Sequence, residues 1–163
     1  MVQYYNVGDT EKTNLSAYVG EINQFVMAYS DLLYRSRDYG TGVLVKQVEV
    51  YTLSLIEKNP GITVSELAQK QRRSKGTVST NVSALEKGGY IYREKRSGNA
   101  KVVHLYGTPA GEKLSTLYVA KTTLDIMKIQ SELLKTNSQA ELNAFCHVLH
   151  QYLRLITKET GRG

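Results

Sequence analysis

The sequence predicts a mainly α-helical fold with a small β-hairpin, namely a winged helix-turn-helix flanked by long dimerisation helices. Three observations lead to this fold class. Residues 62–91 contain two short helical segments joined by a tight turn. Residues 90–106 read as two strands around a polar, glycine-containing turn. Long segments at both ends of the chain carry apolar residues at three-and-four spacing, as in a coiled-coil seam.

The two short helices carry their own start and stop signals. Thr63 and Glu66 form a T-x-x-E capping box, which satisfies the unpaired amides at a helix start, and Ser74 can cap the second helix. Gly88 and Gly89 then end the second helix. Its inner side is predicted from the residues at i, i+4 and i+7, which are Val78, Val82 and Leu85.

The outer side of the second helix carries small and hydroxylated residues. At about 100° per residue, the outward positions are Gly76, Thr80, Ser83 and Lys87, flanked by Thr77 and Ser79. Small side chains let a helix lie deep in a major groove, and hydroxyls donate to or accept from base edges. For this helix alone, a polar face without any binding role is an equally good interpretation.

The segment after the second helix favours the binding interpretation. Residues 90–95 and 102–106 are predicted strands, and residues 96–101 form the turn between them. A helix-turn-helix followed directly by a basic hairpin is a winged helix.

The positive charge of the chain is concentrated in this region. Nine basic residues lie between Lys70 and Lys101, and only Glu86 and Glu94 oppose them. The segment therefore carries a net charge of +7, whereas the whole chain carries +6. Such localised charge is typical of a surface that binds phosphate groups.

Several short motifs from different elements point to one family. They are E-L-A at 66–68, S-x-x-T-V-S at 74–79, L-E-K-x-G-Y-I at 85–91, Arg93 after it, and T-P-A-G at 108–111. Each motif is weak alone, and together they are fairly specific. The chain resembles the MarR family of winged-helix transcription regulators. The order and length of its elements match over nearly the whole chain, with motifs from about Leu44 to Leu114.

The chain departs from the family pattern at four positions. Asn99 and Lys101 stand where the wing usually carries Asp-x-Arg, and Thr80 stands where many members have a basic residue. Gly107 replaces the leucine that usually precedes T-P-A-G.

The resemblance implies a sequence-specific DNA-binding regulator, expected to be a repressor, that acts as a homodimer on an inverted-repeat operator and needs no cofactor. The alternative from another class is a winged-helix module that contacts an acidic protein; hydroxyls between cations favour a DNA groove instead. The expected contacts to double-stranded DNA are Arg72, Arg73, Ser74, Lys75, Gly76, Thr77, Ser79, Thr80, Ser83, Lys87, Arg93, Lys95, Arg96 and Lys101.

The flanking helices are expected to form the dimer. Helices are predicted at about 12–37, 44–58, 108–134 and 139–157, with Val48, Tyr51 and Leu55 on the inner side of the second. The DNA-binding module then covers about 44–106, and about 12–38 and 108–157 are the dimerisation segments. A helical bundle within one chain is the alternative.

A small aromatic effector is a further implication of the resemblance. The candidate pocket residues are Tyr29, Tyr34, Tyr51 and Tyr118, although half-buried packing explains each one as well.

Cys146 lies on an apolar stripe and is expected to be a buried small hydrophobe. His147 and His150 could ligate a metal with a third group, but a polar helix flank is the favoured interpretation, and His104 is expected to be structural.

Composition narrows the remaining classes. The length of 163 residues fits one domain, and the single cysteine fits a reducing cytoplasm. No apolar run approaches the roughly 18 residues of a membrane span, and the first residues do not read as a secretory signal. No nucleophile motif, phosphate-binding glycine loop, H-E-x-x-H or paired-cysteine site appears, so we expect neither enzymatic activity nor a metal site.

Overall fold

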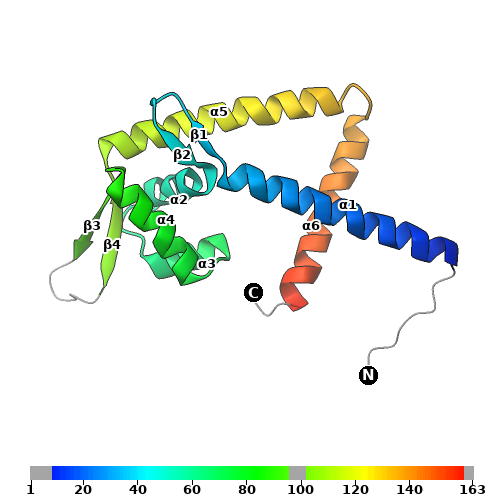
Figure 1. Ribbon diagram of the computed structural model, residues 1–163, viewed down its shortest axis with the longest axis horizontal. Helices are drawn as coiled ribbons and strands as arrows, with labels where there is room; N and C mark the ends of the chain where they lie inside the picture. Colours follow the sequence, from blue (N-terminus) through cyan, green and yellow to red (C-terminus); the bar gives the residue numbers. More distant parts are fainter. Residues whose placement is uncertain (1–8, 96–101, 160–163) are drawn as a thin grey trace.

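The computed structural model describes residues 9–95 and 102–159, with side-chain surroundings within 18–95 and 102–157. Figure 1 shows a winged module at one end of the molecule, with long helices extending from it. The elements in chain order are α1 (Asp9–Tyr34), β1 (Ser36–Asp38), β2 (Leu44–Lys46), α2 (Gln47–Lys58), α3 (Val64–Gln71), α4 (Lys75–Lys87), β3 (Ile91–Lys95), β4 (Val103–Gly107), α5 (Pro109–Leu133) and α6 (Gln139–Glu159).

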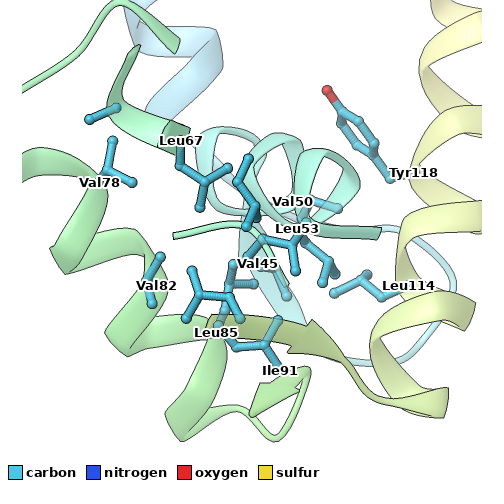
Figure 2. Packing of buried hydrophobic residues seen from close by; sticks show 14 of the residues in the cluster. Val45, Val50, Leu53, Leu67, Val78, Val82, Leu85, Ile91, Leu114 and Tyr118 are labelled. Carbon is cyan, nitrogen blue, oxygen red and sulfur yellow. The ribbon is translucent and has the colours of Figure 1, made fainter. Parts of the chain in front are cut away.

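The core of the winged module is built around α2. Helices α3 and α4, strand β4 and the first half of α5 all pack against it. Figure 2 shows Val82 and Leu85 of α4 directed towards Leu53 of α2, with Leu114 of α5 on the other side. The largest fully buried apolar side chains are Leu53, Ile56, Leu67, Leu85, Leu105 and Leu114. The predicted inner stripe of the second short helix is therefore confirmed.

The predicted inner side of α2 is wrong in part. Val48 is buried as expected, but Tyr51 is 43% exposed and Leu55 only partly buried. The fully buried apolar residues are instead Val50, Leu53 and Ile56. The sequence pattern predicts a single stripe, whereas α2 is covered on several sides and also buries Thr52 and Ser54.

The helix α2 also begins later than predicted, because a β-hairpin precedes it. Strands β1 and β2 pair antiparallel, with Arg37 opposite Val45. The Asp38 carboxylate accepts hydrogen bonds from the amides of Gly40, Thr41 and Gly42 at 2.8, 2.9 and 3.1 Å, which lowers its pKa. This turn chemistry is local to Asp38, although the hairpin was not predicted from the sequence.

The hairpin is attached to α5. Arg37 Nη2 lies 3.0 Å from Asp125 Oδ2. Tyr39, directly after β1, is buried and packs edge-on against Tyr118, with ring centroids 5.4 Å apart. The junction between α1 and α2 is thus fixed to α5 by an ion pair and an aromatic contact.

The four long or medium helices of the sequence prediction are confirmed, with ends within a few residues. In α5, Leu114 and Tyr118 of the first half are buried, while Leu124 and Met127 further along are exposed. Within the described ranges, no helix combines the length and apolar character that crossing a membrane requires.

The long helices expose many large apolar side chains. Helix α1 exposes Tyr18, Val19, Ile22, Phe25, Val26 and Met27, and α5 exposes Leu124, Ile126, Met127, Ile129 and Leu133. Helix α6 exposes Phe145, Val148, Leu149, Tyr152, Leu153, Leu155 and Ile156. Cys146, expected to be buried, is exposed as well, because no other described segment of the chain covers the apolar face of α6.

Candidate nucleic-acid interface

The helix α3 begins at the predicted capping box. The Glu66 amide donates to Thr63 Oγ1 at 3.3 Å, and the Thr63 amide donates to Glu66 Oε2 at 2.8 Å. The amide and the hydroxyl of Thr63 both donate to the Glu66 carboxylate, which lowers the pKa of Glu66. At the other end, Arg72 adopts a left-handed conformation with φ of 51°, which turns the chain towards α4. Arg72 and Arg73 are exposed at this turn.

The helix α4 is capped by Ser74, as predicted. Ser74 Oγ accepts a hydrogen bond from the Thr77 amide at 3.1 Å. Val78 and Val82 are fully buried and Leu85 nearly so. This inner face turns the opposite face to solvent: Ser74, Lys75, Gly76, Thr80, Ser83 and Lys87 are exposed, and Thr77 and Ser79 are partly buried. The structure thus places the expected outer residues of this helix on one surface.

The hydroxyl of Thr80 is already engaged within the helix. Thr80 Oγ1 donates a hydrogen bond to the Gly76 carbonyl oxygen at 3.1 Å. Back-bonding of this kind is common for threonine inside helices. The methyl group is therefore the part of this side chain left for contact with a partner.

A buried polar cluster, missed in the sequence, fixes α4 to its neighbours. Thr52 Oγ1 of α2 accepts hydrogen bonds from Gln71 Nε2 at 3.0 Å and from Asn81 Nδ2 at 3.4 Å. The same hydroxyl donates to the Val48 carbonyl oxygen at 2.8 Å. One hydroxyl thus joins α2, α3 and α4. Its partners lie 19 and 29 residues away, so no local pattern indicates it.

The wing strands are anchored in the core. Strands β3 and β4 pair antiparallel, with Ile91 opposite Gly107 and Arg93 opposite Leu105. Ile91 and Leu105 are buried, and Leu105 also bridges to Ile62 before α3. His104 Nδ1 lies 2.7 Å from the Gly61 carbonyl oxygen, a contact in keeping with the structural role expected for it.

Arg93 points back towards α4. Its Nε lies 2.8 Å from Glu86 Oε2, and its Nη2 donates to Ser83 Oγ at 3.3 Å. Lys75, Gly76, Ser79 and Arg93 line an open groove of about 650 Å³ between the helices and the wing. Lys95 is exposed two residues further along β3. Arg96 and Lys101, also expected contacts, lie outside the described residues.

The four candidate effector residues differ in burial. Tyr118 is buried, whereas Tyr29, Tyr34 and Tyr51 are 48%, 47% and 43% exposed. Burial raises the pKa of Tyr118, and the nearby hydroxyls of Tyr39, Tyr29 and Tyr51 raise it further.

Sequence reasoning missed two polar groups beside Tyr118. The Tyr39 hydroxyl and Gln47 Oε1 are buried without a hydrogen-bond partner among the described residues. Tyr39 lies in the glycine-containing segment before α2, and its position gives no signal of burial.

The histidines of α6 lie on its exposed surface. His147 Nε2 is 2.9 Å from Gln151 Nε2, and His150 is exposed. Within the part of the chain that the structure describes, no three histidine, cysteine, aspartate or glutamate side chains form a group able to hold a metal ion.

The sequence matches of this chain to known proteins cover only part of its length, whereas the structural matches cover most of it. Residues 45–101 match a family model described as MarR family. An uncharacterised HTH-type transcriptional regulator of Bacillus subtilis (strain 168), YhjH, is 33% identical over 81 residues, which is 50% of this chain. The match spans 46% of that relative, so this chain covers about half of its length.

Solved structures match over nearly the full length. Streptococcus pneumoniae FabT in complex with DNA has a TM-score of 0.64 at 22% identity and covers 90% of this chain and 98% of its own. The MarR family transcription regulator SP03579 has a TM-score of 0.72 at 19% identity, covering 94% and 97%. Staphylococcus aureus MarR in complex with salicylate and kanamycin has a TM-score of 0.61 at 18% identity, covering 93% and 95%.

These structural matches concern the fold, and the family match falls on the segment that holds α2, the helix-turn-helix and the first wing strand, β3. The motifs at 66–68, 74–79 and 85–91 lie within this segment, together with the helix-turn-helix of the structure. Residues 45–101 of the chain thus match the MarR family model, and the solved structures share its winged helix-turn-helix fold.

Proposed function

We propose that this protein is a transcriptional regulator that binds double-stranded DNA through α4 and the wing. The observation that carries the proposal is the outer face of α4. There Gly76, Thr80 and Ser83 are exposed between the cations Lys75 and Lys87, while Val78 and Val82 hold the helix in the core. A face without long side chains lets the helix approach base edges in a major groove.

The cations around α4 are placed to bind the DNA backbone. Arg72 and Arg73 are exposed at the turn before α4, and Lys95 is exposed on the wing. Phosphate contacts position a protein on the duplex, and base contacts supply sequence preference. Arg96 and Lys101 remain expected contacts of the wing tip, with phosphate or within the minor groove.

Salt dependence tests the proposal. The protein should select duplexes from a randomised library, and its affinity should fall by orders of magnitude from low to moderate salt. The double variant Lys75→Gln/Lys95→Gln should reduce the slope of log affinity against log salt by about 0.9 for each phosphate group that the variant no longer neutralises. Lys128→Gln on α5, an exposed lysine far along the chain from the winged module, is the matched control.

A flat salt response would contradict DNA binding and favour the alternative of a module that contacts an acidic protein. If Lys128→Gln lowers the slope as much as the double variant does, the surface around α4 and the wing is not the one that binds phosphate groups.

The regulator acts as a homodimer in this proposal. The supporting observation is the exposed apolar surface of α1, α5 and α6. Phe25 of α1 is 58% exposed and Phe145 of α6 is 61% exposed. Large apolar side chains exposed in such numbers are costly in water and support an interface on these helices. A second copy of the chain is the expected occupant, because two winged modules side by side match the symmetry of an inverted repeat.

The oligomeric state can be tested without disturbing the core. Phe25→Asp and Phe145→Asp should shift the mass in sedimentation equilibrium from a dimer towards the 18.3 kDa monomer. Leu44→Asp is the control, because Leu44 is 70% exposed but lies on β2 outside the long helices. A wild-type protein that sediments as a monomer at micromolar concentration would contradict the dimer.

Binding to an inverted repeat, with half-sites about one helical turn apart or a small multiple, follows from two-fold symmetry. We propose repression as the outcome, because a dimer seated on an operator competes with other proteins for the same DNA. Footprinting followed by transcription in vitro tests both statements. Transcription that rises when the protein binds would assign activation instead.

We further propose that a small aromatic acid acts as effector beside Tyr118. The support is the cluster of Tyr29, Tyr39 and Tyr51 around it, near the buried and unpartnered Gln47 Oε1. Binding there would alter how the winged module is held and change DNA affinity by about 1–3 kcal/mol. Salicylate and related phenolic acids should shift both melting temperature and DNA affinity, and Tyr51→Ala should weaken both shifts. The proposal fails if no compound of this class changes either quantity.

A further inference from the structure

Arg93 makes two contacts with one face of α4. Its Nε lies 2.8 Å from Glu86 Oε2, and its Nη2 lies 3.3 Å from Ser83 Oγ. Ser83 and Glu86 are three residues apart, so they are neighbours on the helix surface. The guanidinium of Arg93 on strand β3 therefore contacts the last two turns of α4.

The backbone beneath Arg93 is fixed as well. Arg93 lies opposite Leu105 in the sheet, and Leu105 is fully buried. The side chains of Arg93 and Glu86 are 34% and 41% exposed. The arginine thus connects an anchored strand to an anchored helix. Lys95, the next residue on the same side of β3, is exposed, and no ion pair involves it within the described ranges.

Charge argues against a phosphate contact by Arg93. The guanidinium already has a carboxylate partner, because Glu86 Oε2 lies 2.8 Å from Arg93 Nε. If Arg93 turned towards a phosphate, the Glu86 carboxylate would be left uncompensated close to the DNA backbone, where the potential is negative. The Ser83 hydroxyl would lose its donor at the same time.

We propose that Arg93 is a positioning residue that sets the angle between the wing and α4, and that Ser83 and Glu86 are its acceptors rather than DNA contacts. This inference rests on the proposed DNA-binding function. It revises the expectation from sequence, in which Arg93 contacts phosphate and Ser83 contacts a base edge.

Two measurements distinguish a positioning role of Arg93 from phosphate binding. They are the salt dependence of DNA affinity and the effect of exchanging the charges of Arg93 and Glu86. Arg93→Gln should reduce affinity for the selected site about tenfold but leave the salt slope and non-specific affinity unchanged. Arg93→Lys should behave similarly, since lysine keeps the charge but cannot make two fixed contacts. Glu86→Arg/Arg93→Glu should recover most of the specific affinity. Lys95→Gln is the control, and should lower the salt slope by about 0.9 per phosphate.

An exposed ion pair contributes little to stability, so these variants should keep the wild-type melting temperature. The inference is overturned if Arg93→Gln lowers the salt slope as Lys95→Gln does, if Arg93→Lys restores binding, or if the swapped pair binds no better than Arg93→Gln. Failure of the wild-type protein to bind any duplex would overturn the proposed function along with it. Wild-type binding with any of the other results overturns only the role of Arg93.

Discussion

The carboxylate of Glu57 occupies the space in which a Cβ of residue 107 would lie. Glu57 stands in the last turn of α2 and Gly107 at the end of β4. A Cβ built on Gly107 would overlap Glu57 Oε1. That oxygen is buried and has no hydrogen-bond partner among the described residues. A side chain at position 107 would therefore have to displace the Glu57 carboxylate, whereas the backbone of Gly107 lies in an ordinary strand conformation.

A first prediction follows from this contact. Gly107→Ala should reduce the free energy of unfolding by about 1–3 kcal/mol, because the added methyl overlaps a buried carboxylate. In a Glu57→Ala background the same substitution should cost much less. Urea unfolding of the two single variants and the double variant gives the coupling energy. Gly76→Ala, whose Cβ meets only Ser74 Oγ at 3.9 Å, is the control and should not destabilise. Purely additive effects would show that Glu57 does not set the space at 107.

A second prediction concerns pH. Burial raises the pKa of Glu57 above its ordinary value of 4.5, and the nearby Glu112 raises it further. A raised pKa means that the folded state holds the proton more tightly than the unfolded state. Its contribution to stability is full below pH 4.5 and is lost as pH rises through the folded pKa.

The Glu57→Gln variant lacks this titration. The free energy of unfolding of Glu57→Gln relative to wild type should therefore increase as the pH rises from about 4 to about 8. Glu112→Gln should reduce the pH dependence of the wild-type protein only slightly, because burial is the larger cause. A difference between Glu57→Gln and wild type that stays constant with pH would contradict a raised pKa.

The helix boundaries in the winged module could be predicted because their signals are local. Thr63 and Glu66 cap each other within one turn, and Ser74 and Thr108 each accept a hydrogen bond from an amide three residues later. Side-chain chemistry at such short range can be read directly from one sequence.

The burial of α2 could not be predicted from one stripe. Periodicity assumes a single buried face, whereas α2 meets α4, α5 and β4 on different sides. Burial therefore spreads from Val50 and Leu53 to the polar Thr52, while Tyr51 remains outside. The prediction for Cys146 overestimates burial. Its side chain is exposed, because no other described residues pack against the apolar stripe on which it lies.

In the candidate site, too, local geometry could be predicted from the sequence and long-range contacts could not. The exposed side of α4 follows from helical geometry once Val78 and Val82 are placed inward. The partners of Arg93 do not follow, since a sequence shows a charge but not the group that neutralises it. Glu86 and Ser83 belong to another element and meet Arg93 only through the turn at Gly88 and Gly89.

A third prediction tests the buried polar cluster beneath α4. Thr52→Val keeps the shape of the side chain but removes the acceptor for Gln71 and Asn81. Each buried amide left unpaired costs about 1–3 kcal/mol, so the variant should lose stability of that order. Thr52→Ser keeps the hydroxyl and should lose less, although it leaves a small cavity. Denaturant unfolding of both variants is the measurement. If Thr52→Val is as stable as wild type, these hydrogen bonds do not hold α4.

A fourth prediction concerns Thr80, the outward residue at the middle of α4. Its hydroxyl donates to the Gly76 carbonyl oxygen, so the methyl is the group left for a base contact. A methyl favours contact with the C5-methyl of thymine. Thr80→Val keeps the methyl and should keep the base preference of the wild-type protein. Thr80→Ser and Thr80→Ala remove it, and should cost about 1–3 kcal/mol on the best site and relax preference at one position.

Competition against a randomised duplex library at two salt concentrations distinguishes this readout from anchoring. None of the Thr80 variants should change the salt slope or non-specific affinity, because no charge is altered. Lys101→Ala, at a wing position expected to contact phosphate, should weaken binding to every sequence and lower the slope by about one per subunit. If Thr80→Ser keeps the preference and Thr80→Val loses it, the hydroxyl leaves Gly76 on binding and reads the base itself. If Thr80→Ala and Lys101→Ala lose affinity by the same factor on all sequences, α4 and the wing do not divide specificity and anchoring between them.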